Sequence, residues 1–143
     1  MEKVQLLLRQ HVGAPCAPCV AVGDKVKKGT LIATPTGLGA NIFSSVYGEV
    51  SEILEDRIVI KADAEQPDEF VPIDVPEDAS KLDMIKAAGI VGMGGAGFPT
   101  GIKLNIDLSA TEQGEFREDI NPELPKDFKL EHSYILINDS ECE

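Results

Sequence analysis

The sequence predicts a β plus α/β protein, in which a small all-β barrel or sandwich precedes the start of an α/β domain. The first observation is a run of short apolar segments separated by glycine turns, from residue 3 to residue 61. The second is an acidic, proline-containing stretch at 62–79, which is typical of a linker. The third is a helical pattern followed by a glycine-rich loop, at 80–104. We therefore expect two domains, residues 1–76 and residues 77–143.

The elements of the first domain follow from the positions of its apolar residues. Strands are expected at 3–8, 31–33 and 57–61, where Val, Ile and Leu are concentrated, and further apolar residues lie at 42–43, 46 and 50. Residues 9–19 contain two prolines and are expected to form a loop. Short strands separated by glycine turns every six to ten residues are typical of a small all-β barrel or sandwich.

The second domain is expected to begin with a helix at 81–88, capped by Ser80 or Asp78. Residues 105–131 are polar and acidic and are expected to form a long excursion, with at most a short helix. The apolar stretch 132–138 has the pattern of a buried strand.

Composition and charge restrict the class of partner. The chain has 143 residues and a formal net charge of −12. Residues 1–61 contain seven Lys or Arg and six Asp or Glu, a net of +1, so the remaining residues have a net of −13. This charge disfavours nucleic acid as a partner. No apolar run approaches the ~20 residues of a membrane-spanning helix, and the N-terminus has no signal-peptide pattern. We expect a cytoplasmic protein without direct membrane insertion, with attachment to the inner face of the cell membrane through partners left open.

The glycine-rich loop is the strongest candidate for a binding site. Gly92, Gly94 and Gly97 satisfy the pattern G-x-G-x-x-G, with Gly95 as an extra glycine. Glycine loops of this kind present backbone N–H groups to phosphate, and Lys103 in the following helix would lie near such an anion. The expected element before the loop is a helix and not a strand, so this is not the ordinary Rossmann fingerprint. A bare G-x-G-x-x-G pattern is a weak signal, and the alternative is a glycine-rich turn between two elements.

The longer string from Gly92 to Lys103 resembles a more specific motif. It is similar to the G-x-G-G-A-G-F-P-x-G-x-K loop of the NADH-oxidising flavoprotein subunit of respiratory complex I and of the RnfC-type electron-transfer subunits. The resemblance implies a Rossmann-like α/β domain that binds FMN and NADH. Met93 stands where complex I relatives have arginine and where the RnfC-like branch has methionine or leucine. The loop residues that it implies as ligands are Gly92, Gly94, Gly95, Ala96, Gly97 and Lys103.

A second string, residues 138–143, resembles the N-x-[DA]-E-[SC]-E-P segment of the same family. The resemblance implies that Asn138 contacts the flavin phosphate or ribityl chain. It implies that Glu141 and Glu143 contact sugar hydroxyls or the nicotinamide, and that Ser140 and Cys142 line the same pocket. The alternative is a solvated acidic chain end.

The first domain resembles a barrel-sandwich hybrid, the fold of biotinyl and lipoyl carrier domains. Such carriers bear a modified lysine on a hairpin, but this chain has no lysine between Lys28 and Lys61, and Gly37 stands where that lysine is expected. We therefore expect an unmodified barrel. The segments 10–15, 22–29 and 44–50 resemble the N-terminal region of RnfC-type subunits.

The resemblance implies that hydride passes from NADH to FMN N5 and that single electrons then leave to iron–sulfur clusters. In the family, the rest of the flavin domain and C-x-x-C-x-x-C-x-x-x-C-P runs for [4Fe–4S] clusters follow the second motif. The expectation is therefore a truncated chain, a split gene product or a reading frame ended at a recoded selenocysteine codon. Other subunits of an electron-transfer complex are the implied partners. The alternative function is a non-catalytic docking or scaffold fragment of such a complex.

The cysteines support a further alternative. Cys16 and Cys19 form C-x-x-C, which fits a redox pair or half of a metal site. The RnfC-like protein associated with proline reductase looks similar in this segment, which would make thiol–disulfide exchange plausible. An odd number of cysteines without a signal peptide argues against a disulfide framework. His11 is expected to be structural.

Overall fold

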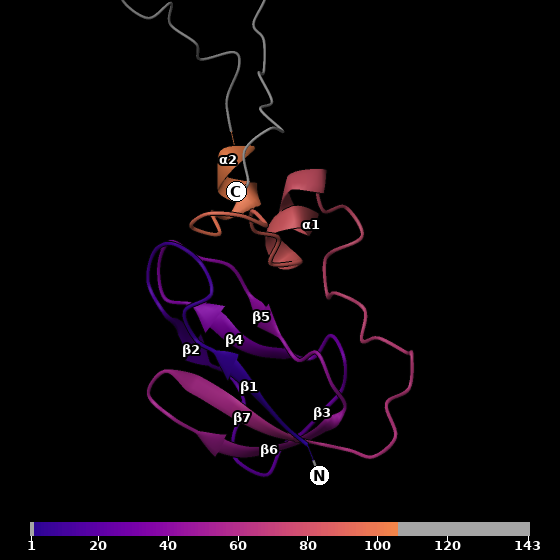
Figure 1. Ribbon diagram of the computed structural model, residues 1–143. Helices are drawn as coiled ribbons and strands as arrows, with labels where there is room; N and C mark the ends of the chain where they lie inside the picture. The colour runs from indigo at the N-terminus through magenta and orange to yellow at the C-terminus, as the bar shows by residue number, and fades with distance from the viewer. Residues whose placement is uncertain (1, 106–143) are drawn as a thin grey trace, which may run out of the picture.

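The computed structural model describes residues 2–105. Seven strands form two antiparallel sheets, and two short helices follow them at one end of the molecule (Figure 1). The predicted strand at 132–138, the excursion at 105–131 beyond Asn105 and the motif at 138–143 lie outside the described residues.

The first sheet has the strand order β1-β7-β6-β3. Its members are β1 (Lys3–Leu7), β7 (Arg57–Ala62), β6 (Gly48–Ile53) and β3 (Lys25–Val26). The register places Gln5 opposite Val59 and Val50 opposite Ile60. A shift in register between Val50 and Glu52 bends β6 and lets the sheet curve around the core.

The second sheet has the order β2-β4-β5, with β2 (Cys16–Pro18), β4 (Leu31–Pro35) and β5 (Ile42–Phe43). The expectation of a loop throughout 9–19 was wrong at its end, because Cys16–Pro18 pairs with β4 despite Pro18. Pro18 is tolerated because β2 is an edge strand of this sheet, where a missing N–H costs no ladder hydrogen bond.

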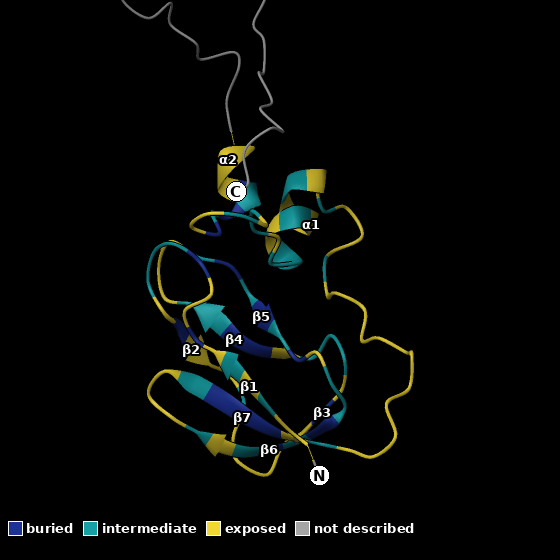
Figure 2. Ribbon diagram, viewed as in Figure 1, coloured by how far each residue is buried: buried dark blue, intermediate teal, exposed yellow. Residues whose placement is uncertain are grey.

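The core lies between the two sheets, where the dark blue residues of Figure 2 gather. Ile32, Val50, Ile58 and Ile60 are fully buried. The buried cluster is composed of aliphatic side chains and one cysteine, as the low aromatic content predicts: Leu8, Cys16, Val26, Ile32, Ala33, Ile42, Val50, Ile58 and Ile60. All of them precede residue 62, so the barrel has a core of its own. The prediction of a small β barrel is confirmed.

The segment after the barrel is attached to the barrel surface. Tyr47 exchanges two hydrogen bonds with Gln66, and Val71 N–H donates to the carbonyl of Lys28 at 2.8 Å. Residues 63–79, expected to form a linker, have no regular secondary structure.

Helix α1 (Lys81–Ala87) follows, with Ser80 as its N-cap. The Ser80 side chain accepts from Asp83 N–H while the Asp83 carboxylate accepts from Ser80 N–H, so both halves of a capping box are present. Helix α2 (Thr100–Lys103) begins after Pro99. The prediction of a helix rather than a strand before the glycine loop is confirmed. The Rossmann-like sheet stays a prediction, since residues beyond 105 are not described.

Candidate functional site

The glycine-rich loop between α1 and α2 forms a small closed hairpin. Its two sides meet at Val91 and Pro99, which form an isolated antiparallel bridge. Gly92 N–H donates to the carbonyl of Phe98 at 2.9 Å, and Thr100 N–H donates to the carbonyl of Ile90 at 2.9 Å. These bonds fix the base of the loop, so that residues 93–97 form its tip.

The tip presents backbone donors that have no partner in the hairpin. In the described chain, the N–H groups of Met93, Gly94, Gly95 and Ala96 donate to no backbone carbonyl. Gly95 has φ +58°, and a Cβ placed on it would meet no atom within 4 Å, so the space beside it is open. Consecutive backbone N–H groups around a residue with positive φ form a concavity that suits anions. The tip can therefore accept a phosphate or a similar oxyanion.

Backbone groups of the barrel contact the loop tip and hold it in place. Val12 N–H donates to the carbonyl of Ala96 at 2.8 Å. Gly97 has φ +61°, and a Cβ there would lie 3.0 Å from the carbonyl oxygen of Gln10 and 3.3 Å from the Cα of His11. Glycine at 97 thus permits both the backbone turn and the close approach to the barrel.

His11 holds this part of the barrel in place. The side chain is buried, with 6% of its surface exposed. Nε2 accepts from Ala40 N–H at 3.1 Å, which assigns the ring hydrogen to Nδ1, and Nδ1 donates to the carbonyl of Val12 at 3.1 Å. Gly39 leaves room for the ring, since a Cβ there would lie 2.5 Å from His11 Cε1. The expectation that His11 is structural is confirmed, and its contacts also connect it to the residue that holds Ala96.

Lys103 lies in α2, the helix that follows the loop. Its Nζ is 5.7 Å from the centre of the Phe98 ring, and its side chain is exposed. This cation–π contact keeps the ammonium group near the loop. Gly101 lets α2 pack closely on α1, because a Cβ there would lie 2.4 Å from Cγ of Lys86.

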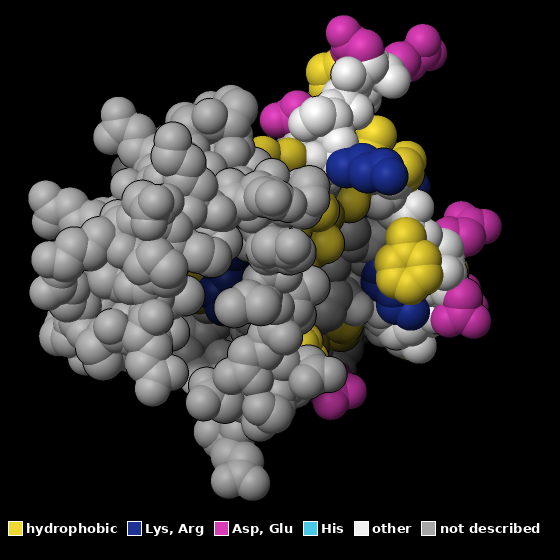
Figure 3. Space-filling view, turned by 90° about the horizontal axis from the view of Figure 1, so that it is seen from above, with side chains coloured by type: hydrophobic (Ala, Val, Ile, Leu, Met, Phe, Trp, Pro, Cys, Tyr) yellow, Lys and Arg dark blue, Asp and Glu magenta, His cyan; other side chains and the backbone are white. Residues whose placement is uncertain are grey.

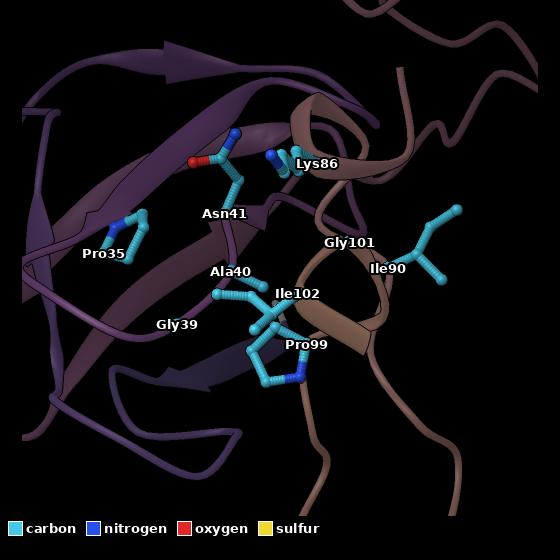
Figure 4. Close-up of a pocket in the computed structure, with 9 residues that line it drawn as sticks. All are labelled: Pro35, Gly39, Ala40, Asn41, Lys86, Ile90, Pro99, Gly101 and Ile102. Atoms are coloured by element: carbon cyan, nitrogen blue, oxygen red, sulfur yellow. The ribbon is translucent and has the colours of Figure 1, made fainter. Parts of the chain in front are cut away.

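A cavity of about 180 Å³ marks the seam between the barrel and the loop. Figure 4 shows Pro99 and Ile102 beside Ala40, with Asn41 and Lys86 on the other side of the space. The Asn41 side chain donates to the carbonyl of Ala87 at 3.0 Å, so the two parts are hydrogen-bonded across the seam. The lining is mostly apolar, and it stabilises the position of the loop rather than offering a polar binding site.

The structure does not bring the two thiols of the C-x-x-C segment together. Cys16 Sγ is buried, donates to the carbonyl of Ala40 at 3.3 Å and lies 3.4 Å from Nε2 of His11, whereas Cys19 is exposed and donates to the carbonyl of Leu31. Along an extended strand their Cα atoms are about 10 Å apart, beyond the roughly 7 Å that a disulfide can bridge. Burial raises the pKa of both thiols, which lowers their thiolate fraction at neutral pH. A redox role for this pair stays a prediction, and this geometry gives it no support. No three His, Cys, Asp or Glu side chains converge in residues 2–105.

The barrel matches a known domain. The family model for the RnfC barrel sandwich hybrid domain matches residues 1–73. The chain belongs to the RnfC family. Its RnfC relatives include a subunit of the proton-translocating ferredoxin:NAD(+) oxidoreductase complex from Clostridium ljungdahlii, 40% identical over 121 residues, 72% of this chain and 26% of that protein.

Two further relatives cover nearly the whole chain. One, from the ion-translocating oxidoreductase complex of Rhodobacter capsulatus, is 33% identical over 156 aligned residues, 98% of this chain and 26% of that protein. The other, from the Na(+)-translocating ferredoxin:NAD(+) oxidoreductase complex of Acetobacterium woodii, is 32% identical over 158, 99% of this chain and 31% of that protein. The chain thus spans about a quarter to a third of the length of these RnfC relatives, which are named as subunits of complexes.

Of the ten predicted binding residues, six lie in the described chain. The structure gathers Gly92, Gly94, Gly95, Ala96 and Gly97 in one loop and places Lys103 beside its base. Asn138, Ser140, Glu141 and Glu143 lie outside the described residues. Sequence reasoning missed the contribution of Gln10, His11 and Val12 to supporting the loop. The similarity of segment 10–15 to RnfC subunits drew attention to that segment. No sequence pattern, however, predicts that it contacts residues 96–97.

Proposed function

We propose that this chain is the N-terminal part of an electron-transfer subunit that binds FMN and NADH and passes electrons to iron–sulfur clusters on other segments or subunits. The observation that supports the proposal is the loop tip, where four consecutive N–H groups donate to no backbone carbonyl of the described chain and the space beside Gly95 is open among the described residues. Family membership and the names of the Clostridium and Acetobacterium relatives, which include ferredoxin:NAD(+) oxidoreductase, agree with it.

The residues present fit a phosphate-bearing cofactor. The second half of the chain has a net charge of −13, so its overall field repels phosphate. A phosphate must therefore be bound by local donors, namely the amides of residues 93–96 and the ammonium group of Lys103. A Cβ at Gly95 would occupy the open space that such a ligand needs. Glu141 and Glu143, together with Asn138 and Ser140, are proposed to complete the pocket through hydrogen bonds to sugar hydroxyls.

In this proposal the cofactor and the protein groups have separate roles. FMN, when bound, supplies the chemistry that links a two-electron donor to one-electron acceptors. The loop amides and Lys103 bind and orient the phosphate, and the barrel holds the loop rigid. No side chain in this proposal acts as an acid or a base.

We also propose a cytoplasmic location, at the inner face of the cell membrane through other subunits. Neither helix of residues 2–105 has the length or hydrophobicity that crossing a bilayer requires.

The test is FMN binding followed by flavin fluorescence, with a pair of matched glycine variants. Gly95→Val fills the open space at the loop tip and should weaken FMN binding at least tenfold. Gly23→Val is the control, because Gly23 also has a positive φ, +97°, and an open Cβ position, but lies in a barrel turn. Both variants carry backbone strain, and the change in FMN affinity should follow Gly95 alone. Equal losses in the two variants, or no binding to the parent protein, would show that the loop is not the FMN site.

A further inference from the structure

The segment that joins the barrel to α1 is a rigid strap and not a free linker. We define the strap as residues 63–75. Asp63 N–H donates to the carbonyl of Tyr47 at 2.9 Å, and Tyr47 N–H and carbonyl bond both ends of the Gln66 amide at 2.9 and 2.8 Å. The Tyr47 hydroxyl donates to the carbonyl of Glu69 at 3.0 Å. The strap is therefore bonded to Tyr47 at three positions, residues 63, 66 and 69.

The close fit at residue 71 fixes the strap further. Val71 N–H donates to the carbonyl of Lys28. Gly29 has φ +85°, and a Cβ there would lie 2.7 Å from the carbonyl oxygen of Val71. A glycine at this barrel turn is what lets the strap approach.

This rigid strap holds large apolar side chains in solvent. Phe70 is 72% exposed and Ile73 is 46% exposed. With Phe43 and Ala88 they line an open hollow of about 310 Å³. An exposed aromatic side chain on a fixed backbone is the usual form of an interface hot spot, since little conformational entropy is lost when a partner covers it.

The charged side chains of the chain segment that contains Phe70 are all negative. The range 62–79 contains seven Asp or Glu and no Lys or Arg. Lys28 is the nearby cation, but its Nζ lies 6.0 Å from the Phe70 ring centre and 3.8 Å from Asp68, and its side chain is 19% exposed. Its charge is thus directed under the ring and toward an acidic neighbour. In the part of Figure 3 that lies beyond the grey atoms, yellow hydrophobic side chains lie among magenta acidic and dark blue basic side chains.

We propose that the exposed surface of the strap around Phe70 is a protein-docking surface. Its occupant is another subunit of the electron-transfer complex, and this subunit presents an apolar pocket rimmed by Lys or Arg. The inference rests on membership of a family whose relatives are complex subunits. A second copy of this chain would bring acidic strap against acidic strap, and an anionic membrane or nucleic acid would meet the same repulsion. A basic rim attracts the strap and leaves Phe70 to fill the pocket.

The test is site-specific photo-crosslinking in the cells that produce the protein. A benzophenone amino acid replaces Phe70 in the full-length protein, and after irradiation the crosslinked peptide is sequenced by mass spectrometry. The control position is Val22, which is 62% exposed in a barrel turn and is not part of the strap. The expected result is a crosslink from position 70, and none from position 22, to a subunit segment with apolar residues flanked by Lys or Arg. A crosslink from position 70 to a second copy of the chain, or a yield no higher than that of position 22, would overturn the proposal.

A second measurement separates docking from folding. Phe70→Ala and Val22→Ala both remove an exposed apolar side chain, so both variants should fold. Phe70→Ala should lower co-purification of the crosslinked subunit at least tenfold, and 0.5 M NaCl should lower it for the parent protein. Val22→Ala should leave co-purification unchanged. Retention of the subunit by Phe70→Ala would overturn the proposal. FMN binding does not involve the strap, so a failure here leaves the flavin titration of Gly95→Val to decide the proposed function separately.

Discussion

His11 connects the interior of the barrel with the glycine loop through hydrogen bonds made by both of its ring nitrogens. Replacing it with alanine leaves Ala40 N–H without its acceptor in a buried place. We expect His11→Ala to lower the free energy of unfolding by about 2 kcal/mol, the usual cost of an unsatisfied buried donor. Urea denaturation measures the change. Gln10→Ala is the control, because Gln10 is exposed and its side chain, within residues 2–105, bonds only to the Leu7 carbonyl. An equal loss of unfolding free energy in both variants would contradict this role of His11.

Cys16 gives the stability of the barrel a pH dependence. An unperturbed thiol titrates near 9.0, and burial raises the pKa of Cys16 in the folded state. Its contribution to stability is therefore complete below about pH 9 and is lost as the pH rises through the raised pKa of the folded state. Cys16→Val should remove the part of this loss that Cys16 contributes, whereas Cys19→Ser should remove only the part that comes from Cys19, whose pKa burial also raises. The measurement is urea denaturation at several pH values from about 7 to 10.5, and parallel curves for the parent and Cys16→Val would contradict it.

Residue-level predictions succeeded where a residue type has one dominant use. The G-x-G-x-x-G pattern identified the loop that contains Gly95 and Gly97, and both residues have the positive φ that favours glycine. The burial of Cys16 could not be predicted, because C-x-x-C is read as a functional pair, whereas here β2 directs one thiol into the core and leaves the other exposed. The spacing of two cysteines carries no information about which side of a strand faces the core when the strand itself is not predicted.

At the scale of single elements, α1 depends on its capping box more than on its own core contacts, since it has no fully buried residue. We expect Ser80→Ala to destabilise α1 by about 1 kcal/mol. The Ser80 hydroxyl holds the pKa of Asp83 below its ordinary value of 3.8, so the same variant should raise that pKa. An NMR titration of the Asp83 carboxyl checks the pKa, and amide hydrogen exchange of α1 checks the helix. Lys81→Ala, outside the capping box, should change neither quantity appreciably.

The strap shows why some elements escape sequence reasoning. The acidic, proline-containing composition of 62–79 predicted a linker, and the structure confirms the absence of regular secondary structure there. The composition could not show that Gln66 bonds the backbone of Tyr47, nineteen positions earlier. Such contacts follow no periodicity, so the strap looked like a flexible linker in the sequence. Helix α1 and the strands β1, β4 and β7 were predictable because their apolar positions form a pattern within the element.

For the whole molecule, the position of the core predicts that the barrel folds alone. Every residue of the buried cluster lies between Leu8 and Ile60. A chain ending at residue 76 should therefore keep its β structure and unfold cooperatively, with a lower midpoint because the seam around Asn41 is exposed. Circular dichroism during thermal unfolding measures both. A 1–76 chain without a cooperative transition would contradict the two-domain division, which stays a prediction.

The hydrogen bond from Val12 to Ala96 has a consequence for how this protein can be rearranged by recombination. A boundary near residue 76 is a natural point for exchanging one N-terminal module for another, and such a chimaera would retain every glycine of the loop. It would nevertheless lose the backbone donor that holds Ala96 and the surface against which Gly97 rests. The loop would then have the right composition without the shape that its neighbour imposes. The two modules can be divided at one point of the sequence. The loop of the second module nevertheless obtains part of its rigidity from the first, so a functional exchange has to replace both modules together.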